Sequence, residues 1–110
     1  MIARTWHGRV PARDADAYHA YLQRTGLADY QATPGFGGML VQRWFEADVA
    51  HFLLTTLWES EQAIRAFAGE DISVARYYPE DDAYLLEREP EVRHAAVLVA
   101  TLGRVEGQAS

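Results

Sequence analysis

An alternating pattern of side chains opens the sequence. Residues 2–10 alternate loosely, with large side chains at Ile2, Arg4, Trp6 and Val10, and a period of two residues is typical of a strand. Pro11 ends the pattern, and proline is favoured in the first turn of a helix. The sequence therefore predicts a strand over residues 2–10 that leads directly into a helix.

A helical period follows this strand. Ala15, Tyr18 and Leu22 share one face of a helix, whereas the opposite face carries polar and charged side chains. Gly26 is a typical stop signal at the C-terminus of a helix. The pattern predicts an amphipathic helix that ends at Gly26, with residues 27–30 continuing as a frayed turn.

A hairpin is predicted in the middle of the sequence. Residues 33–35, Thr-Pro-Gly, form a turn signal. Residues 39–45 and 51–58 then predict two strands, joined by a polar loop at residues 46–48. The second of these strands is apolar in both phases, with Phe52, Leu54, Thr56 and Trp58 on one face and His51, Leu53, Thr55 and Leu57 on the other.

A second helix follows the hairpin. Ser60 is a favoured cap for a helix over residues 61–68, and Gly69 ends it. Beyond it, Val74, Tyr77 and Tyr78 suggest one more helical turn.

The last third of the sequence is harder to interpret. We expect Pro79 to break the helical turn and residues 80–82, Glu-Asp-Asp, to form a solvated corner. Residues 92–102 predict a final strand that is apolar on both faces. Residues 103–110 are expected to be a disordered tail, which leaves residues 1–102 as a single domain.

This order of elements predicts an α+β fold. Strand, helix, strand, strand, helix and strand make a ferredoxin-like βαββαβ sandwich with an antiparallel sheet, and both helices cover one face of that sheet. Strands that are apolar on both faces need a second cover. Because the predicted helices supply only one cover, we expect a homodimer in which two sheets face each other.

Composition excludes several kinds of chemistry. The 110 residues include no cysteine, and all ten basic residues are arginine, which rules out thiolate metal sites, a Schiff-base lysine and a P-loop lysine. The net charge of −6 argues against nucleic acid and anionic membranes as partners. No apolar run is long enough to span a bilayer, and no signal peptide is recognisable, so the cytoplasm is the expected location.

One segment resembles a known family. Residues 52–61, Phe-Leu-Leu-Thr-Thr-Leu-Trp-Glu-Ser-Glu, are followed by Ala63, Phe67 and Ala68. Together with the Thr-Pro-Gly turn, they resemble the antibiotic-biosynthesis-monooxygenase domain of the dimeric α+β barrel superfamily, over about residues 2–99. The resemblance implies a barrel of two protomers, each with a pocket between its sheet and its helices. It leaves the reaction open, because this superfamily includes cofactor-free oxygenases, haem degraders, quinol oxygenases and members without known activity.

The sequence departs from the pattern of the haem-degrading branch at three positions. Haem degraders of the superfamily resemble one another in an Asn on the first strand, a Trp on the second helix and a His beyond it. In this sequence the corresponding positions are at or beside His7, at Phe67 and at Tyr77. The sequence also lacks any Asn, the amide donor of the cofactor-free aromatic oxygenases.

These positions supply the candidate site residues. His7 is the candidate general base and Tyr77 a candidate hydrogen-bond donor, while Trp6, Trp58, Phe67 and Tyr78 are candidates for the substrate pocket. The structural alternatives are that Trp58 is a plug under the helix and that the two tyrosines only pack. No spacing of histidines or carboxylates suggests a metal site, and no motif suggests a bound cofactor.

Three functions remain open at this point. The first is a cofactor-independent monooxygenase that acts on a small polyketide-like or quinol-like aromatic molecule. The second is a non-catalytic barrel that binds a small apolar ligand or serves in a stress response. The third is a haem-binding protein with altered ligation.

Overall fold

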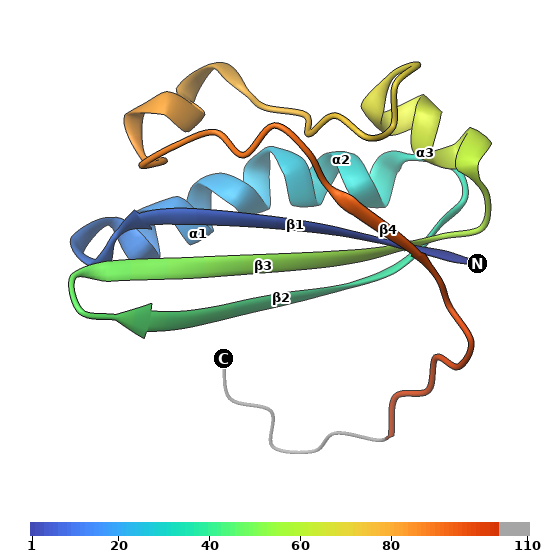
Figure 1. Cartoon of the computed structure of the whole chain (residues 1–110), viewed down its shortest axis with the longest axis horizontal. Coiled ribbons are helices and arrows are strands. Elements are labelled where there is room, and N and C mark those ends of the chain that lie inside the picture. Colours follow the sequence, from blue (N-terminus) through green and yellow to red (C-terminus); the bar gives the residue numbers. More distant parts are fainter. Residues whose placement is uncertain (104–110) are drawn as a thin grey trace.

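The structure, a computed structural model, describes residues 1–103, and Figure 1 shows their arrangement. The elements in order are strand β1 (Ile2–Pro11), 3₁₀ helix η1 (Ala12–Asp14), helices α1 (Ala15–Arg24) and α2 (Gly26–Ala32), strands β2 (Phe36–Glu46) and β3 (Val49–Trp58), helix α3 (Glu61–Ala68), 3₁₀ helix η2 (Pro79–Ala83) and strand β4 (Arg93–Ala96). No helix within residues 1–103 is long and apolar enough to cross a membrane.

The sheet has the predicted ferredoxin-like topology. Its four strands are antiparallel and lie in the order β2-β3-β1-β4. β1 pairs with β3 over its whole length, but β4 pairs only with residues 2–5 of β1. Beyond residue 5, the chain returning from η2 borders β1, and the Leu86 N–H donates to the Arg9 carbonyl at 2.9 Å. The α+β prediction is therefore confirmed at the level of fold.

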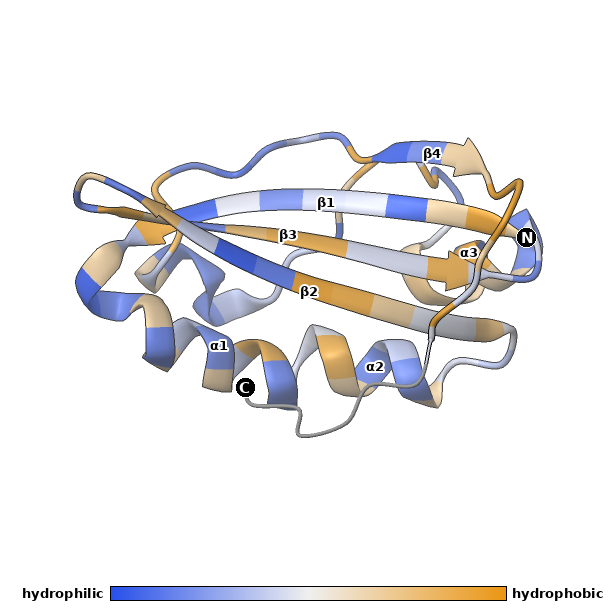
Figure 2. Ribbon diagram, turned by 90° about the horizontal axis from the view of Figure 1, so that it is seen from below, coloured by the Kyte–Doolittle hydropathy of each residue, from blue (hydrophilic) through white to orange (hydrophobic). Residues whose placement is uncertain are grey.

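The pairing register assigns each residue to one of two faces. Trp6 pairs with Leu54 on the face that the helices cover, and its neighbour His7 pairs with Leu53 on the opposite face. Along β3 buried and half-buried residues alternate throughout. We call the side under the helices, which carries Trp6 and Leu54, the covered face, and the opposite side, which carries His7 and Leu53, the open face. The hydrophobic stretches of β2 and β3 stand out in Figure 2.

The core lies between the covered face and the helices. Trp58, Phe52 and Tyr18 are among its largest fully buried side chains. Ile64 of α3 is also fully buried, because this short helix packs on the sheet through its apolar face. The predicted cap is confirmed, since the Ser60 hydroxyl accepts a hydrogen bond from the Ala63 N–H at 3.1 Å.

Two predictions about helices are wrong. Gly26 does not end the helical region but begins a second helix, α2, after a kink at Thr25, because Leu27 and Tyr30 have room to pack into the core. Residues 74–78 form no helical turn, since Val74 bridges to Glu91 in an extended arrangement. Pro79 breaks no helix there and instead begins η2, as proline's fixed φ allows.

The acidic corner and the final strand also differ from the prediction. Asp81 is only 4% exposed, because its carboxylate accepts hydrogen bonds from the Tyr78 N–H and the Tyr18 hydroxyl. The final strand is limited to β4, and Leu98 and Val99 beyond it lie exposed outside any strand. The predicted disordered tail lies, apart from Gly103, outside the described residues.

Candidate functional site

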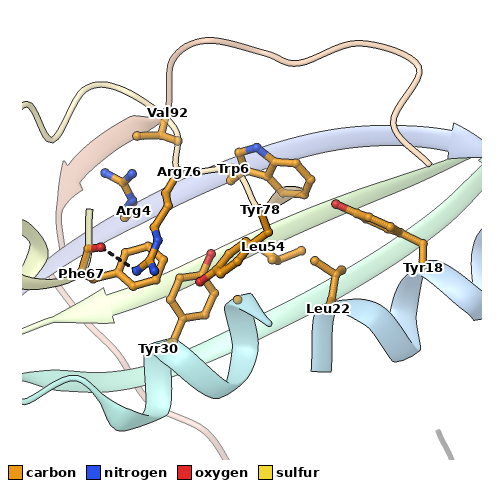
Figure 3. A pocket seen from close by; sticks show the side chains of 11 residues that line it. Arg4, Trp6, Tyr18, Leu22, Tyr30, Leu54, Phe67, Arg76, Tyr78 and Val92 are labelled. Atoms are coloured by element: carbon orange, nitrogen blue, oxygen red, sulfur yellow. Dashed lines mark hydrogen bonds between the residues drawn. The ribbon is translucent and has the colours of Figure 1, made fainter. Parts of the chain in front are cut away.

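A small cavity lies between the covered face of the sheet and the helices. Its volume is about 30 Å³. Figure 3 shows side chains from β1, β3, α1, α2, α3 and the segments beyond α3 converging on it. The lining residues are Arg4, Trp6, Tyr18, Leu22, Gly26, Tyr30, Leu54, Phe67, Arg76, Tyr78 and Val92. Five aromatic rings, two guanidinium groups and no carboxylate line this space, which is suited to a flat, electron-rich molecule.

Arg4 is the most deeply buried charge of the cavity. Its residue is 4% exposed. Nη1 donates to the Ile72 carbonyl and contacts the His94 Nε2 at 3.0 Å, and Nη2 donates to the Val74 carbonyl at 3.1 Å. Because an arginine side chain has only donors, His94 Nε2 must accept this bond. Burial lowers the pKa of Arg4, and burial together with the charge of Arg4 lowers the pKa of His94.

Trp6 reaches the cavity because its neighbour on the same face has no side chain. A Cβ at Gly8 would lie 2.2 Å from the Trp6 Cη2, so only glycine leaves room for the indole ring. The Trp6 Nε1–H donates to the Tyr77 hydroxyl at 3.2 Å, and that hydroxyl donates to the Glu89 carbonyl. Gly8 and Tyr77 therefore set the orientation of the indole.

The mouth of the cavity is formed by residues from the segment after α3. The Arg76 guanidinium lies 4.9 Å from the centre of the Phe67 ring and 5.0 Å from that of Tyr78. It donates to the Phe67 carbonyl at 2.9 Å and lies 3.4 Å from the Asp29 carboxylate. The Tyr78 hydroxyl donates to the same carboxylate. Asp29 of α2 thus holds both mouth residues in place.

Two tyrosine hydroxyls face the cavity from the helices. The Tyr18 hydroxyl donates to the buried Asp81 carboxylate at 3.1 Å, and its pKa is raised by burial and by that negative charge. Burial raises the pKa of Tyr30 to about 12, against the opposing effect of Arg4 and Arg76. Both hydroxyls therefore stay protonated at neutral pH, and Tyr30 can donate a hydrogen bond to a ligand.

A different polar cluster lies on the open face. His7 Nδ1 is 2.6 Å from a Glu89 carboxylate oxygen, and His7 Nε2 is 2.9 Å from His51 Nδ1. His51 Nε2 lies 3.6 Å from a Glu46 carboxylate oxygen, and the His51 ring stacks on Trp44 with the ring centres 4.7 Å apart. The cluster is a row of two imidazoles between two carboxylates.

The structure brings some of the predicted site residues together and separates others. Trp6, Phe67 and Tyr78 line the cavity as predicted. Trp58 does not: it is fully buried, packs against Phe67 and donates to the Thr56 hydroxyl at 2.8 Å. This position corresponds to the structural alternative, a plug under the helix.

His7 and Tyr77 do not share a cavity. His7 is on the open face, whereas Tyr77 contacts Trp6 of the covered face with the ring centres 6.2 Å apart. The two residues meet only through Glu89, which His7 contacts at the side chain and Tyr77 at the backbone. The expectation that both reach one pocket is therefore wrong, because successive strand residues point to opposite faces.

Sequence reasoning missed Arg4, and it noted Arg76 beside a possible substrate without including it among the candidate site residues. Arg4 lies in the same strand phase as Ile2 and Trp6, so the alternation itself placed it on the covered face. Arg76 lies in an extended segment, and residues 76 and 78 face the cavity while residue 77 does not. Tyr77 was a candidate because it corresponds to a histidine position of the family, and it lies outside the cavity lining, with its hydroxyl against the Trp6 indole.

Among the lining residues, only tyrosine hydroxyls could ligate a haem iron. No imidazole is among the residues that line the cavity. His94, which contacts the lining residue Arg4, already accepts a hydrogen bond from it. Within residues 1–103, no group of three or more histidine, aspartate or glutamate side chains is arranged to hold a metal ion.

Comparison with known proteins identifies the fold. No family model and no curated protein sequence matches the chain. Among solved structures, a mutant of MhuD with two manganese protoporphyrin IX molecules bound per active site superimposes with a TM-score of 0.60 and 18% identity, covering 94% of this chain and 100% of that one. A candidate antibiotic biosynthesis monooxygenase from Bacillus cereus superimposes with a TM-score of 0.55 and 16% identity over 94% of this chain and 97% of that one.

The chain has the antibiotic-biosynthesis-monooxygenase fold. A protein of unknown function from Nitrosomonas europaea has it too, with a TM-score of 0.55 and 17% identity over 96% of this chain and 98% of that one. The resemblance stated from the sequence is confirmed at this level. Since identities below 20% in these three cases carry no site residue across, the chemistry must be argued from this chain's own cavity.

Proposed function

We propose that the protein is a cofactor-independent monooxygenase that acts on a small, electron-rich aromatic molecule. The observation that carries the proposal is the aromatic cavity between the sheet and the helices, in a fold that a candidate monooxygenase shares. Five aromatic rings around two guanidinium groups favour a planar ligand that can carry negative charge.

The proposed reaction needs little chemistry from the protein. An anthrone-like substrate would first lose a ring C–H proton to water at the open mouth. Its carbanion can then reduce oxygen directly: the carbon gains one oxygen atom as a new carbonyl, and the other oxygen atom leaves as water with the second hydrogen of that carbon and a proton from solvent. The chain's residues would bind the ring, favour its anionic form and exclude bulk water. Trp6 and Phe67 would stack on the ring, and the Tyr30 hydroxyl would donate to its oxygen.

Binding of a ring requires the mouth to open. A cavity of about 30 Å³ holds roughly one water molecule. Among the lining residues, Trp6, Arg76, Tyr78 and Val92 are at least partly exposed, and Asp29 holds Arg76 and Tyr78. We expect them to move outward with the segment after α3 and to close again over the substrate.

The proposal includes a homodimer that buries the open face. Large apolar side chains are exposed there: Leu40 is 51% exposed, and Val99 and Leu102, which lie in the same recess as Leu40 and Leu57, are each 82% exposed. Exposed apolar groups gathered on one face are typical of an interface. A second copy related by a two-fold axis would cover them.

Oxygen consumption tests the proposed function. The protein is mixed with anthrone or with a quinol in an oxygen-electrode cell, and the product is identified by mass spectrometry after incubation with ¹⁸O₂. We expect one labelled oxygen atom in the product and a rate well above that without protein. The variant Phe67→Ala should lose this rate through loss of stacking, whereas Gln62→Ala, on the exposed side of α3, should keep it.

Two results would favour the other functions. Tight binding of the aromatic molecule without oxygen uptake would point to a ligand-binding barrel. A Soret band that survives gel filtration after haem titration would point to haem binding, in spite of the missing imidazole ligand in the cavity.

A further inference from the structure

We propose that the cavity selects ligands that carry an anionic oxygen on the aromatic ring, and that Arg4 is the residue that binds this oxygen. The inference rests on the site of the proposed function and names its substrate class: aromatic carboxylates or ionised phenols and enols, as opposed to neutral arenes. It concerns binding, so it can be tested independently of turnover.

The hydrogen bonds of Arg4 leave part of the guanidinium free. An arginine side chain has five N–H donors, and three of them have acceptors among residues 1–103: two backbone carbonyls and the His94 ring. The Arg4 Nε atom makes no hydrogen bond within this part of the chain. It is also not fully buried, since the Tyr21 hydroxyl is the only fully buried side-chain polar atom without a partner among residues 1–103. The remaining donors can therefore reach a ligand in the cavity that Arg4 lines.

The charge of Arg4 is not balanced by the protein. No carboxylate among residues 1–103 lies within ion-pair distance of its guanidinium. Each of its three acceptors is uncharged, since His94 accepts the hydrogen bond as a neutral ring. By contrast Arg9, Arg43, Arg65, Arg76 and Arg88 each lie beside a carboxylate.

A buried cation without a counter-ion costs free energy of folding. A stable protein retains such a group where something else gains from it, and an anionic ligand would supply the missing charge. Figure 3 shows the guanidinium groups of Arg4 and Arg76 toward the same end of the cavity, near Phe67, with Tyr18 and Leu22 at the other end. A ligand would accordingly direct its anionic oxygen toward the two arginines and its ring toward Trp6 and Leu54.

The test compares an anion with its neutral isostere. Calorimetric titration of the wild-type protein with 2-naphthoate and with 2-naphthamide measures the preference directly. We expect 2-naphthoate to bind at least tenfold more tightly, since a charge-assisted hydrogen bond in a dry site is stronger than a neutral one. Titration with 2-naphthol on either side of its own pKa separates the two oxygen types: tighter binding of the ionised form shows that a phenolate is also accepted.

Variants assign the preference to Arg4. Arg4→Gln should reduce the affinity for 2-naphthoate roughly tenfold or more and leave that for 2-naphthamide nearly unchanged, and Arg4→Lys should keep part of the preference for the anion. Arg65→Gln, an exposed arginine of α3, is the matched control and should change neither affinity. Circular dichroism confirms folding of each variant, and if Arg4→Gln does not fold, Arg4→Lys and the wild-type comparison decide the question.

Two outcomes would overturn the inference. Equal affinity of the wild-type protein for 2-naphthoate and 2-naphthamide would show that the cavity does not select charge. An anion preference that persists in folded Arg4→Gln would assign it to another residue, Arg76 first. Selective anion binding without oxygen uptake from anthrone would contradict the proposed monooxygenase and leave this inference standing, so the two failures are distinguishable.

Discussion

The polar side chains on the two faces of the four-stranded sheet have different kinds of partner. On the covered face, Arg4 is buried with only neutral partners. On the open face, His7 and His51 each lie beside a carboxylate, and their neighbours are half-exposed. The covered face therefore holds a charge that a ligand can complement, whereas the polar side chains of the open face already hydrogen-bond to one another. The difference places the candidate chemistry on the covered face and the expected subunit contact on the open face.

The largest expected effect concerns packing on the covered face. Trp58→Ala removes a fully buried ring that packs against Tyr30, Phe36 and Phe67, and it should cost about 3–5 kcal/mol in the free energy of unfolding. Urea denaturation followed by circular dichroism measures it. Trp44→Ala removes a ring of the open face that is 38% exposed, and about 1 kcal/mol or less is expected. Equal losses would contradict the assignment of the core to one face only.

The second prediction tests the open face as an interface. Leu40→Glu places a charge where an apolar side chain is 51% exposed, and it should raise the dissociation constant of the homodimer by at least about a hundredfold, because a buried unpaired charge is costly. Sedimentation equilibrium measures the change in mass. Leu86→Glu is the control. Leu86 is similarly exposed, but it lies in the chain that borders β1 on the side opposite β3, so this change should leave the mass unchanged. A wild-type protein that is monomeric at micromolar concentration would refute the dimer outright.

The third prediction concerns the shape of the cavity. Gly8→Ala places a Cβ within 2.2 Å of the Trp6 indole, and the ring must move. We expect destabilisation of about 1–3 kcal/mol from overpacking and a roughly tenfold weaker affinity for an aromatic ligand. Gly103→Ala, with no atom within 4 Å of its Cβ and outside the cavity lining, is the control, and its affinity should stay as in the wild type. Unchanged ligand affinity in Gly8→Ala would mean that Trp6 does not shape the site.

A smaller effect is expected from Tyr77→Phe. This change keeps the ring against Trp6 but removes the hydroxyl that links the Trp6 Nε1–H to the Glu89 carbonyl. The protein should lose about 1 kcal/mol of stability, and turnover of a true substrate should fall only a few-fold, since Tyr77 acts through Trp6. A fall as large as that of Phe67→Ala would instead place the Tyr77 hydroxyl in contact with the substrate.

The smallest effect is expected from His7→Ala, and it tests the comparison of the faces most directly. Because His7 lies on the open face, its removal should change turnover by less than about twofold if the covered-face cavity is the site. Steady-state oxygen uptake measures this. A loss of roughly a hundredfold, the effect of removing a general base, would move the reaction to the open face and restore His7 as the catalytic base.

The sequence was informative where periodicity alone decides the structure. Alternation along residues 2–10 and 51–58 located two strands and both faces of the sheet, and Ser60 located the start of α3. It was misleading where long-range contacts override local signals. Gly26 is a good helix terminator in isolation, but the burial of Leu27 and Tyr30 sustains a second helix beyond it. Asp81 looks solvated until Tyr18, from a distant helix, donates to it.

The candidate site was predictable only in part for the same reason. Trp6 and Phe67 could be placed from strand phase and from the resemblance. Arg4 was in the right phase, but a charged side chain on a buried face is rare enough that the pattern was interpreted through its apolar members. Tyr78 was named as a pocket residue, but Arg76 was not and Tyr77 was chosen in its place. Three residues are too few to show whether a segment is helical or extended, and the two conformations turn different side chains toward the cavity.

The chain that returns from η2 along β1 also limits how this sheet can grow. The Leu86 N–H donates to the Arg9 carbonyl, and β4 pairs with residues 2–5 along the same edge of β1. This edge therefore offers no continuous row of free backbone groups to a strand of another molecule. Within residues 1–103, two outer edges lack a neighbouring strand, that of the four-residue β4 and that of β2. Charged side chains such as Arg43 and Glu46, together with the register shift between Phe36 and Gly38, lie along that strand. Such features discourage edge-to-edge stacking, so the fold resists fibrous aggregation while its open face remains free to pair.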